Sequence, residues 1–235
     1  MTRCFTVSTG TFVNFSTNGL VFQLPLADQV RLQEICQPVA LSEGQILCLP
    51  EKSQAAKVYF LTGACVTLWV QNPGQPSLAV GLIGSEGAVG LGAALRQNPR
   101  HLRFEVQSPG PAWCADSLAL QRLLQSQPAL LWTVARYLWQ MTHDMAQMAA
   151  AIQCDDILTR LAAWLVLCAQ RANNPTLRLT HDQLAHMLGV RRVSVTLAAA
   201  ELKKMGLLNY SRGVIDIMDM VRLAQLGNTR PRARP

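Results

Sequence analysis

Side chains that could bind phosphates and base edges gather in one short segment. Arg191, Arg192, Ser194 and Thr196 lie close together around Val193. Guanidinium groups bind phosphates and guanine edges, hydroxyls bind phosphates, and an aliphatic side chain can contact a thymine methyl group. Two cations in the first turn of a helix oppose its dipole by about 0.3–1 kcal/mol each. The pair is therefore better placed for binding a polyanion than for stability.

The segment around these residues has the spacing of two helices joined by a sharp turn. Thr180 and Gln183 form a T-x-x-Q capping box, and Gly189 suits a left-handed turn. Small or apolar residues then repeat at helical spacing: Leu184, Ala185 and Leu188, followed by Val195, Ala198 and Leu202. The pattern predicts a helix-turn-helix whose second helix exposes the basic segment. An ordinary helical hairpin with two surface arginines is the alternative.

The residues that follow predict a wing. Gly206 ends the second helix, and an apolar run leads to a turn at 211–213 that carries Arg212. Val214, Ile215 and Ile217 then continue as a strand, which predicts a two-stranded wing. The DNA-contacting residues expected in this module are Thr180, Arg191, Arg192, Val193, Ser194, Thr196 and Arg212.

The charge of the chain is concentrated at the same end. The 235 residues carry a net charge of +7, and residues 181–235 hold nine Lys and Arg against four Asp and Glu, so this last quarter supplies +5. Such a chain is long enough for two domains, and a basic domain beside a nearly neutral one is expected when only one of them meets a polyanion. No basic amphipathic anchor for a membrane surface is apparent.

Targeting signals and disulfides are not expected. The chain has no run of 18 apolar residues, and its first residues are too polar for a signal-peptide core. Seven cysteines form no C-x-x-C pair, and we expect them to be mostly buried thiols. We therefore predict a cytoplasmic protein with no membrane partner. Its tail at 223–235, rich in Arg and Pro, is expected to be disordered.

Short apolar or alternating runs predict an antiparallel β-roll in the first half. The runs lie at 45–50, 57–62, 64–70, 78–84, 102–107 and 111–115, separated by Gly, Pro and Asn. Helices are expected at 26–36 and 116–126, the second capped by Asp116. With the helical C-terminal part, the roll predicts an α+β protein.

A long helix is expected between the two halves, from Pro128 to about 155. Its apolar residues are spaced 3, 4, 3, 4, 3 and 4 apart, as in a heptad seam: Leu131, Val134, Leu138, Met141, Met145, Met148 and Ile152. This spacing favours a homodimer, although a helix packed only within its own chain is the alternative. The predicted domains are a roll at 1–127, a dimer helix at 128–153, a DNA-binding domain at 154–222 and the tail.

The chain resembles the Crp/Fnr family of bacterial transcription regulators. The resemblance rests on LTHDQLAHMLGVRRVSVTLAAAELKKMGLLNYSRGVIDI and, less specifically, on VYFLTGACVTLWV and VGLIGSEGAVGL. It implies a cyclic-nucleotide-binding-like roll, a dimer helix and a winged helix-turn-helix, with DNA contacts at 191–194. Well-studied activators carry an Arg-Glu pair and a further Arg where this chain has Arg192, Val193 and Leu197. A different operator is therefore expected.

The roll departs from the family's cyclic-nucleotide binders. Those proteins place Gly-Glu and Arg-Ser pairs around the sugar and phosphate, whereas here Ala88 follows Gly87 and Phe104 follows Arg103. Cys4 and Cys36 lie too far apart to imitate the family's iron-sulfur ligands, and a haem ligand is not indicated. We expect no cofactor, and an unknown small-molecule effector other than a cyclic nucleotide.

The function expected is a homodimeric, sequence-specific transcription regulator. Its partners would be duplex DNA, a second copy, the effector and, as a further candidate, RNA polymerase. The alternatives are a cyclic-nucleotide-responsive regulator and a protein-binding signalling module. An enzyme is not expected, because the pairs His143–Asp144 and His181–Asp182 are sequence neighbours that do not face each other on a helix.

Overall fold

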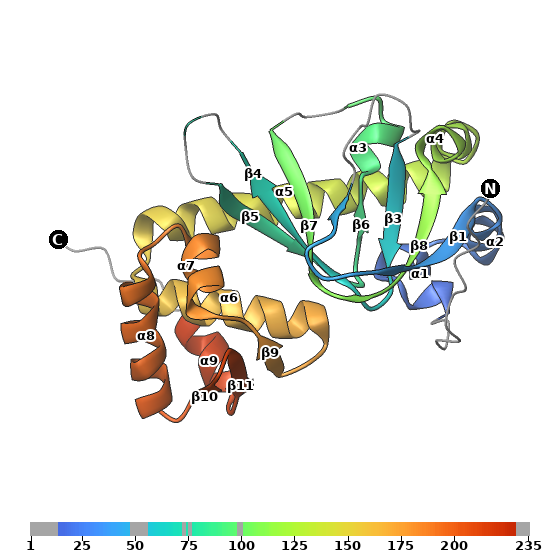
Figure 1. Cartoon of the computed structure of the whole chain (residues 1–235). Helices are drawn as coiled ribbons and strands as arrows, with labels where there is room; N and C mark the ends of the chain where they lie inside the picture. The colour runs from blue at the N-terminus through green and yellow to red at the C-terminus, as the bar shows by residue number, and fades with distance from the viewer. Residues whose placement is uncertain (1–13, 48–55, 72–73, 75–76, 98–100, 229–235) are drawn as a thin grey trace, which may run out of the picture.

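A computed structural model describes residues 14–47, 56–71, 74, 77–97 and 101–228. The first half forms a roll of strands, one long helix runs along it, and a helical unit with a small sheet packs against one end of the roll (Figure 1). None of the helices in these ranges is long and apolar enough to cross a membrane. The arrangement confirms the expected α+β architecture.

Two antiparallel four-stranded sheets form the roll. One has the order β1-β8-β3-β6 and the other the order β2-β7-β4-β5. The strands are β1 (Cys36–Leu41), β2 (Ile46–Leu47), β3 (Lys57–Leu61), β4 (Cys65–Val70), β5 (Leu78–Ile83), β6 (Ala88–Val89), β7 (Leu102–Ser108) and β8 (Gly110–Asp116). Residues from both sheets share one buried cluster, including Leu61, Val66 and Val106.

Short helices surround the roll: a 3-10 turn (Phe15–Thr17), α1 (Gly19–Phe22), α2 (Leu26–Glu34), α3 (Leu91–Ala94) and α4 (Ser117–Ser126). As expected, Asp116 caps α4, and its carboxylate accepts from the backbone N–H of Leu118 and Ala119. The predicted helix at 26–36 ends earlier, because residues from Cys36 pair with β8 as strand β1. Strand β1 contains Pro38, and its buried and exposed residues do not alternate, so its sequence lacks the usual pattern of a strand.

The long helix α5 spans Pro128–Cys154, close to its predicted bounds, with Pro128 in its first turn. The C-terminal unit follows: α6 (Ile157–Ala172), β9 (Thr176–Arg178), α7 (His181–Leu188), α8 (Arg192–Lys204), β10 (Leu208–Ser211), β11 (Val214–Ile217) and α9 (Met220–Gly227). The tail expected at 223–235 therefore begins too early, because α9 buries Leu223 in the core of this unit, and residues 229–235 lie outside the described residues. The expected two-stranded wing is present, and β9 adds a third strand on the far side of β11.

The roll and the C-terminal unit share a hydrophobic cluster. Trp69, Ala79 and Leu82 of strands β4 and β5 lie in the same buried cluster as residues of α6, α7 and α8. The Trp69 ring packs on His186 of α7, with 4.8 Å between ring centroids. The C-terminal unit is therefore held against the roll of its own chain by apolar contact.

Candidate nucleic-acid interface

The first helix of the helix-turn-helix begins and ends where the sequence predicts. The Thr180 hydroxyl accepts from the Gln183 N–H at 3.2 Å, and the Thr180 N–H donates to the Gln183 side chain at 2.8 Å, which completes the capping box. Gly189 ends α7 with a left-handed φ of +64°. The Val190 N–H donates to the Ala185 carbonyl at 3.0 Å, so the turn into α8 is tight.

Helix α8 exposes the basic segment and buries the opposite side. Arg191 is its N-cap residue without a side-chain capping bond, and Arg192, Val193 and Thr196 are exposed beside it. Ser194 is half-buried. The buried residues of α8 are Val195, Ala198, Ala199 and Leu202. Arg191 therefore takes no part in capping α8, and the exposed first turn of the helix is positively charged.

A histidine that the sequence analysis did not place in the interface joins three of its elements. One ring nitrogen of His181 lies 3.0 Å from the Thr196 hydroxyl, which also donates to the Arg192 carbonyl at 3.1 Å. The ring stacks on Tyr210 of β10, with centroids 4.2 Å apart. Burial, together with the charge of Arg192, lowers the pKa of His181 against the opposing effect of Asp182. No sequence spacing reveals this contact, because it depends on how α7, α8 and β10 pack.

The wing turn lies beside the start of α7. Arg212 and Gly213 both have positive φ, +48° and +79°, as a two-residue type I′ turn requires. A Cβ atom on Gly213 would lie 3.5 Å from the Thr180 methyl group, so the turn lies close to the capping residue. Arg212 is exposed there, whereas the Thr180 hydroxyl is occupied by Gln183. The expected interface residues are therefore gathered at one end of the C-terminal unit.

Arg192 is also paired within the chain. Its guanidinium lies 3.5 Å from the Asp182 carboxylate, and both side chains are about two-thirds exposed. Exposed pairs of this kind contribute about 0–1 kcal/mol. Such a pair restrains the side chain only weakly, so Arg192 can exchange the carboxylate for a phosphate or a base edge.

In the roll, Arg103 and Gly87 stand where the resemblance would place residues that bind a cyclic nucleotide, but both are in contact with other side chains of the chain. Arg103 forms an ion pair with Glu105 at 2.9 Å and lies over the Trp69 ring at 5.7 Å. Space beside Gly87 is filled by Tyr137 of α5, since a Cβ atom there would lie 2.1 Å from the tyrosine oxygen. Within the described ranges, no group of three His, Cys, Asp or Glu side chains could hold a metal ion.

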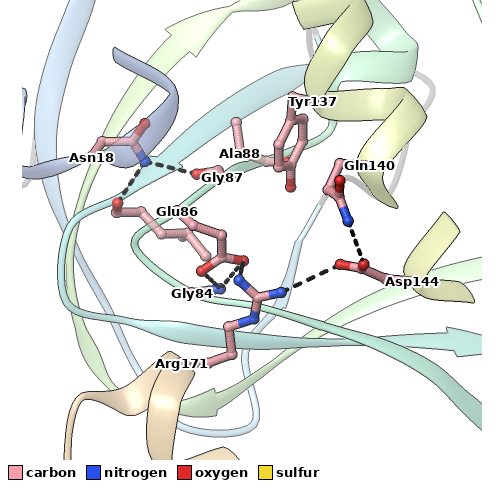
Figure 2. Close-up of polar contacts among 10 residues, drawn as sticks. Asn18, Gly84, Glu86, Gly87, Ala88, Tyr137, Gln140, Asp144 and Arg171 are labelled. Atoms are coloured by element: carbon pink, nitrogen blue, oxygen red, sulfur yellow. Dashed lines mark hydrogen bonds and ion pairs between the residues drawn. The ribbon is translucent and has the colours of Figure 1, made fainter. Parts of the chain in front are cut away.

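A polar junction connects the roll, α5 and α6 (Figure 2). Arg171, at the end of α6, forms ion pairs with Glu86 of the β5–β6 turn at 2.9 Å and with Asp144 of α5 at 3.5 Å. The Glu86 carboxylate also accepts from the Gly84 N–H, and Gln140 donates to Asp144 at 2.8 Å. One arginine thus joins the C-terminal unit to both other parts of the molecule.

Most residues of the predicted dimer seam on α5 pack against the roll or the C-terminal unit of the same chain. Val134 is 1% exposed in a cluster with the roll, and Leu138, Met141 and Met148 pack against buried clusters of the same chain. Met145 and Ile152 line an open cleft of about 1430 Å³ between β5, α5 and α6. Leu131 is exposed. The opposite side of α5 exposes Trp132 and Trp139, which the sequence analysis left out of the seam.

Comparison with known families identifies the C-terminal unit. Residues 159–226 match the family model of the Crp-like helix-turn-helix domain. The match begins in α6 and ends in α9, so it includes α7, α8 and the wing. No curated protein is similar enough to count as a match.

Solved structures with the same fold cover most of the chain. A Crp/Fnr-family regulator from Eubacterium rectale is 15% identical, with a TM-score of 0.67 over 91% of this chain and all of the other. The c-di-GMP-responsive regulator CLP of Xanthomonas campestris is 16% identical, with a TM-score of 0.67 over 83% of this chain and all of the other. A Crp/Fnr-family regulator from Thermus thermophilus is 21% identical, with a TM-score of 0.66 over 83% of this chain and all of the other. This chain therefore carries a Crp-like helix-turn-helix domain at residues 159–226 and has the fold of Crp/Fnr-family transcription regulators over most of its length.

Proposed function

We propose that the protein is a homodimeric, sequence-specific DNA-binding transcription regulator of the Crp/Fnr type. The observation that carries the proposal is the first turn of α8, where Arg191, Arg192 and Val193 are exposed on a helix whose other side is buried. Helices in this position of a helix-turn-helix enter the major groove with their N-terminal residues on base edges. Arg212 on the wing would contact a phosphate beside the groove.

The effector is proposed to be a small molecule other than a cyclic nucleotide. Arg103, which the resemblance would place beside the phosphate of a cyclic nucleotide, is paired with Glu105 and lies over the Trp69 ring. Tyr137 occupies the space beside Gly87. An anion would have to displace these partners. Adding cyclic AMP, cyclic GMP or cyclic di-GMP should leave DNA affinity unchanged, and an increase with any of them would establish the alternative of a cyclic-nucleotide-responsive regulator.

Dimerisation is proposed to use the outer side of α5. Exposed residues there follow one another at spacings of 3, 4, 3, 4 and 3: Trp132, Ala135, Trp139, Thr142, Ala146 and Ala149. The Thr142 hydroxyl donates to the Leu138 carbonyl at 2.9 Å, so its methyl group is the part left to face a neighbour. This is the heptad spacing of a helix pair, with small residues that allow close approach and two tryptophans that add contact area. Two copies joined there would carry two α8 helices to two half-sites.

Selection from random duplex DNA tests the proposal. The full chain is used to enrich bound sequences, and the winning site is then titrated at several salt concentrations. We expect a two-fold-symmetric site whose affinity falls steeply with salt, since neutralised phosphates release counterions. Enrichment of no site, together with salt-insensitive binding, would favour the protein-binding signalling module instead.

A further inference from the structure

Two aliphatic side chains stand exposed on the face of α8 that also carries the arginines. Val193 is 66% exposed and Leu197 is 67% exposed, and they lie four residues apart, so they are neighbours along one side of the helix. We call this pair the apolar stripe. The side of α8 that packs on the protein is formed by other residues, among them Val195, Ala198 and Ala199. The apolar stripe therefore takes no part in the core of its own domain.

The surroundings of the apolar stripe indicate what covers it. Arg191 and Arg192 precede it, and Lys203 and Lys204 follow it at the end of α8. A partner that fits must be anionic at its edges and apolar at its centre. The major groove of DNA has this character where thymines occur, because phosphates line its rims and each thymine presents a 5-methyl group inside it.

We propose that the apolar stripe reads thymine: Val193 and Leu197 contact thymine 5-methyl groups in the major groove, beside the hydrogen bonds made by Arg192. This inference rests on the proposed function and specifies its DNA sequence. Four residues of helix advance about 6 Å, close to two base steps of about 3.4 Å each. The half-site is therefore expected to contain two thymines within about two base steps of each other.

Uracil substitution tests the proposal directly. In the site selected from random DNA, each thymine is replaced singly by deoxyuridine, which removes the methyl group and leaves base pairing unchanged. At two positions in each half-site, we expect the Kd to rise about three- to fivefold, the effect of losing one buried methyl group. Thymines elsewhere in the same duplex serve as internal controls and should give no change.

Protein variants assign each methyl group to its side chain. Val193→Ala should weaken binding to the thymine site and abolish the thymine–uracil difference at one position only. Leu197→Ala should do the same at the other. Both side chains are exposed, so circular dichroism and thermal unfolding should match the parent protein, and the uracil comparison with unchanged protein does not depend on these variants.

The outcomes separate this inference from the function on which it rests. A selected site that binds equally well with thymine or uracil at every position would overturn the inference and leave the DNA-binding function standing. A thymine–uracil difference that persists in both alanine variants would also overturn it, because other residues would then read the methyl groups. If no duplex is enriched at any salt concentration, the proposed function and this inference both fail.

Discussion

At the residue scale, Arg191 and Arg192 are the side chains at the start of α8 that we expect to contact DNA. The double variant Arg191→Ala with Arg192→Ala should weaken specific binding by several kcal/mol, at about 1–3 kcal/mol for each base contact. Fold stability should change little, since Arg191 makes no capping bond and Arg192 makes only an exposed ion pair. Fluorescence anisotropy with the selected duplex measures the affinity. Arg122→Ala, an exposed arginine on α4, is the matched control and should bind normally.

Retained affinity in the double variant, with Arg122→Ala unchanged, would place the DNA contact elsewhere on the molecule. Arg212 at the wing turn would then be the next residue to replace, because it is exposed beside Thr180 and Gly213.

The lowered pKa of His181 predicts how stability responds to acid. The unfolded chain keeps a histidine pKa near 6.5, whereas burial and Arg192 lower it in the folded protein. Below about pH 6.5 the unfolded state therefore binds the proton first, so stability falls as the pH drops toward the folded pKa and is constant above 6.5. Urea unfolding between about pH 5 and 8 measures the slope.

His181→Phe provides the comparison for this pH dependence. Phenylalanine keeps a ring to stack on Tyr210 but cannot titrate and cannot bond to Thr196. The variant should have a flatter stability profile on the acid side. Equal slopes in the two proteins would show that protonation of His181 is not linked to unfolding.

At the scale of elements, the start of α7 depends on its capping box. Thr180→Ala removes the hydroxyl that accepts from the Gln183 N–H and should lower the free energy of unfolding by about 1 kcal/mol. Thr180→Ser keeps that acceptor and should retain most of the stability. Chemical denaturation of both variants checks this, and a loss of the same size in Thr180→Ser would assign the effect to the threonine methyl group instead.

The second prediction at this scale concerns dimerisation through the outer side of α5. Trp139 is 76% exposed, so Trp139→Glu should leave the fold of one chain intact while it places a charge between two copies. Met141 packs against a buried cluster of its own chain, so Met141→Glu should lower the thermal stability of the fold. Sedimentation velocity and thermal unfolding separate the two effects.

The result also decides between the two seams of α5. A dimer that survives Trp139→Glu but is lost in Met141→Glu, with folding unchanged, would support the seam expected from the sequence. Loss of the dimer in Trp139→Glu alone would support the outer side.

For the whole molecule, the junction between the roll and the C-terminal unit gives a prediction that can be tested by one substitution. A Cβ atom on Gly84 would lie 2.5 Å from the Arg171 carbonyl oxygen, so Gly84→Ala must push the β5–β6 turn and the end of α6 apart. Amide hydrogen exchange should then rise at both segments, and the ion pair of Arg171 with Glu86 should weaken. The cores of the two parts should stay protected.

Gly81→Ala is the matched control for this change. Gly81 lies on strand β5, shortly before the turn that holds Gly84, and a Cβ atom there meets only the Leu68 side chain at an ordinary 3.7 Å. Exchange should be unchanged in this variant. Equal exchange in both variants would show that the turn adjusts without moving α6.

The sequence predicted local features because they depend on neighbours in the chain. The capping box at Thr180, the left-handed Gly189 and the cap at Asp116 each act within three or four residues, and all three are confirmed. Strand β1 was missed because its pairing partner β8 lies far along the chain and its own burial does not alternate.

A roll, a long helix and a winged helix-turn-helix could be predicted from the sequence, because periodicity, caps and turn residues encode each element locally. Three features depend on how the folded chain packs: which side of α5 faces its own chain, the contacts of His181 with α8 and β10, and the ion pairs by which Arg171 joins three parts of the molecule. A heptad of apolar residues meets a partner helix or its own domain equally well. Burial of Val134 and exposure of Trp139 follow from how the roll packs on the helix, which no local pattern contains.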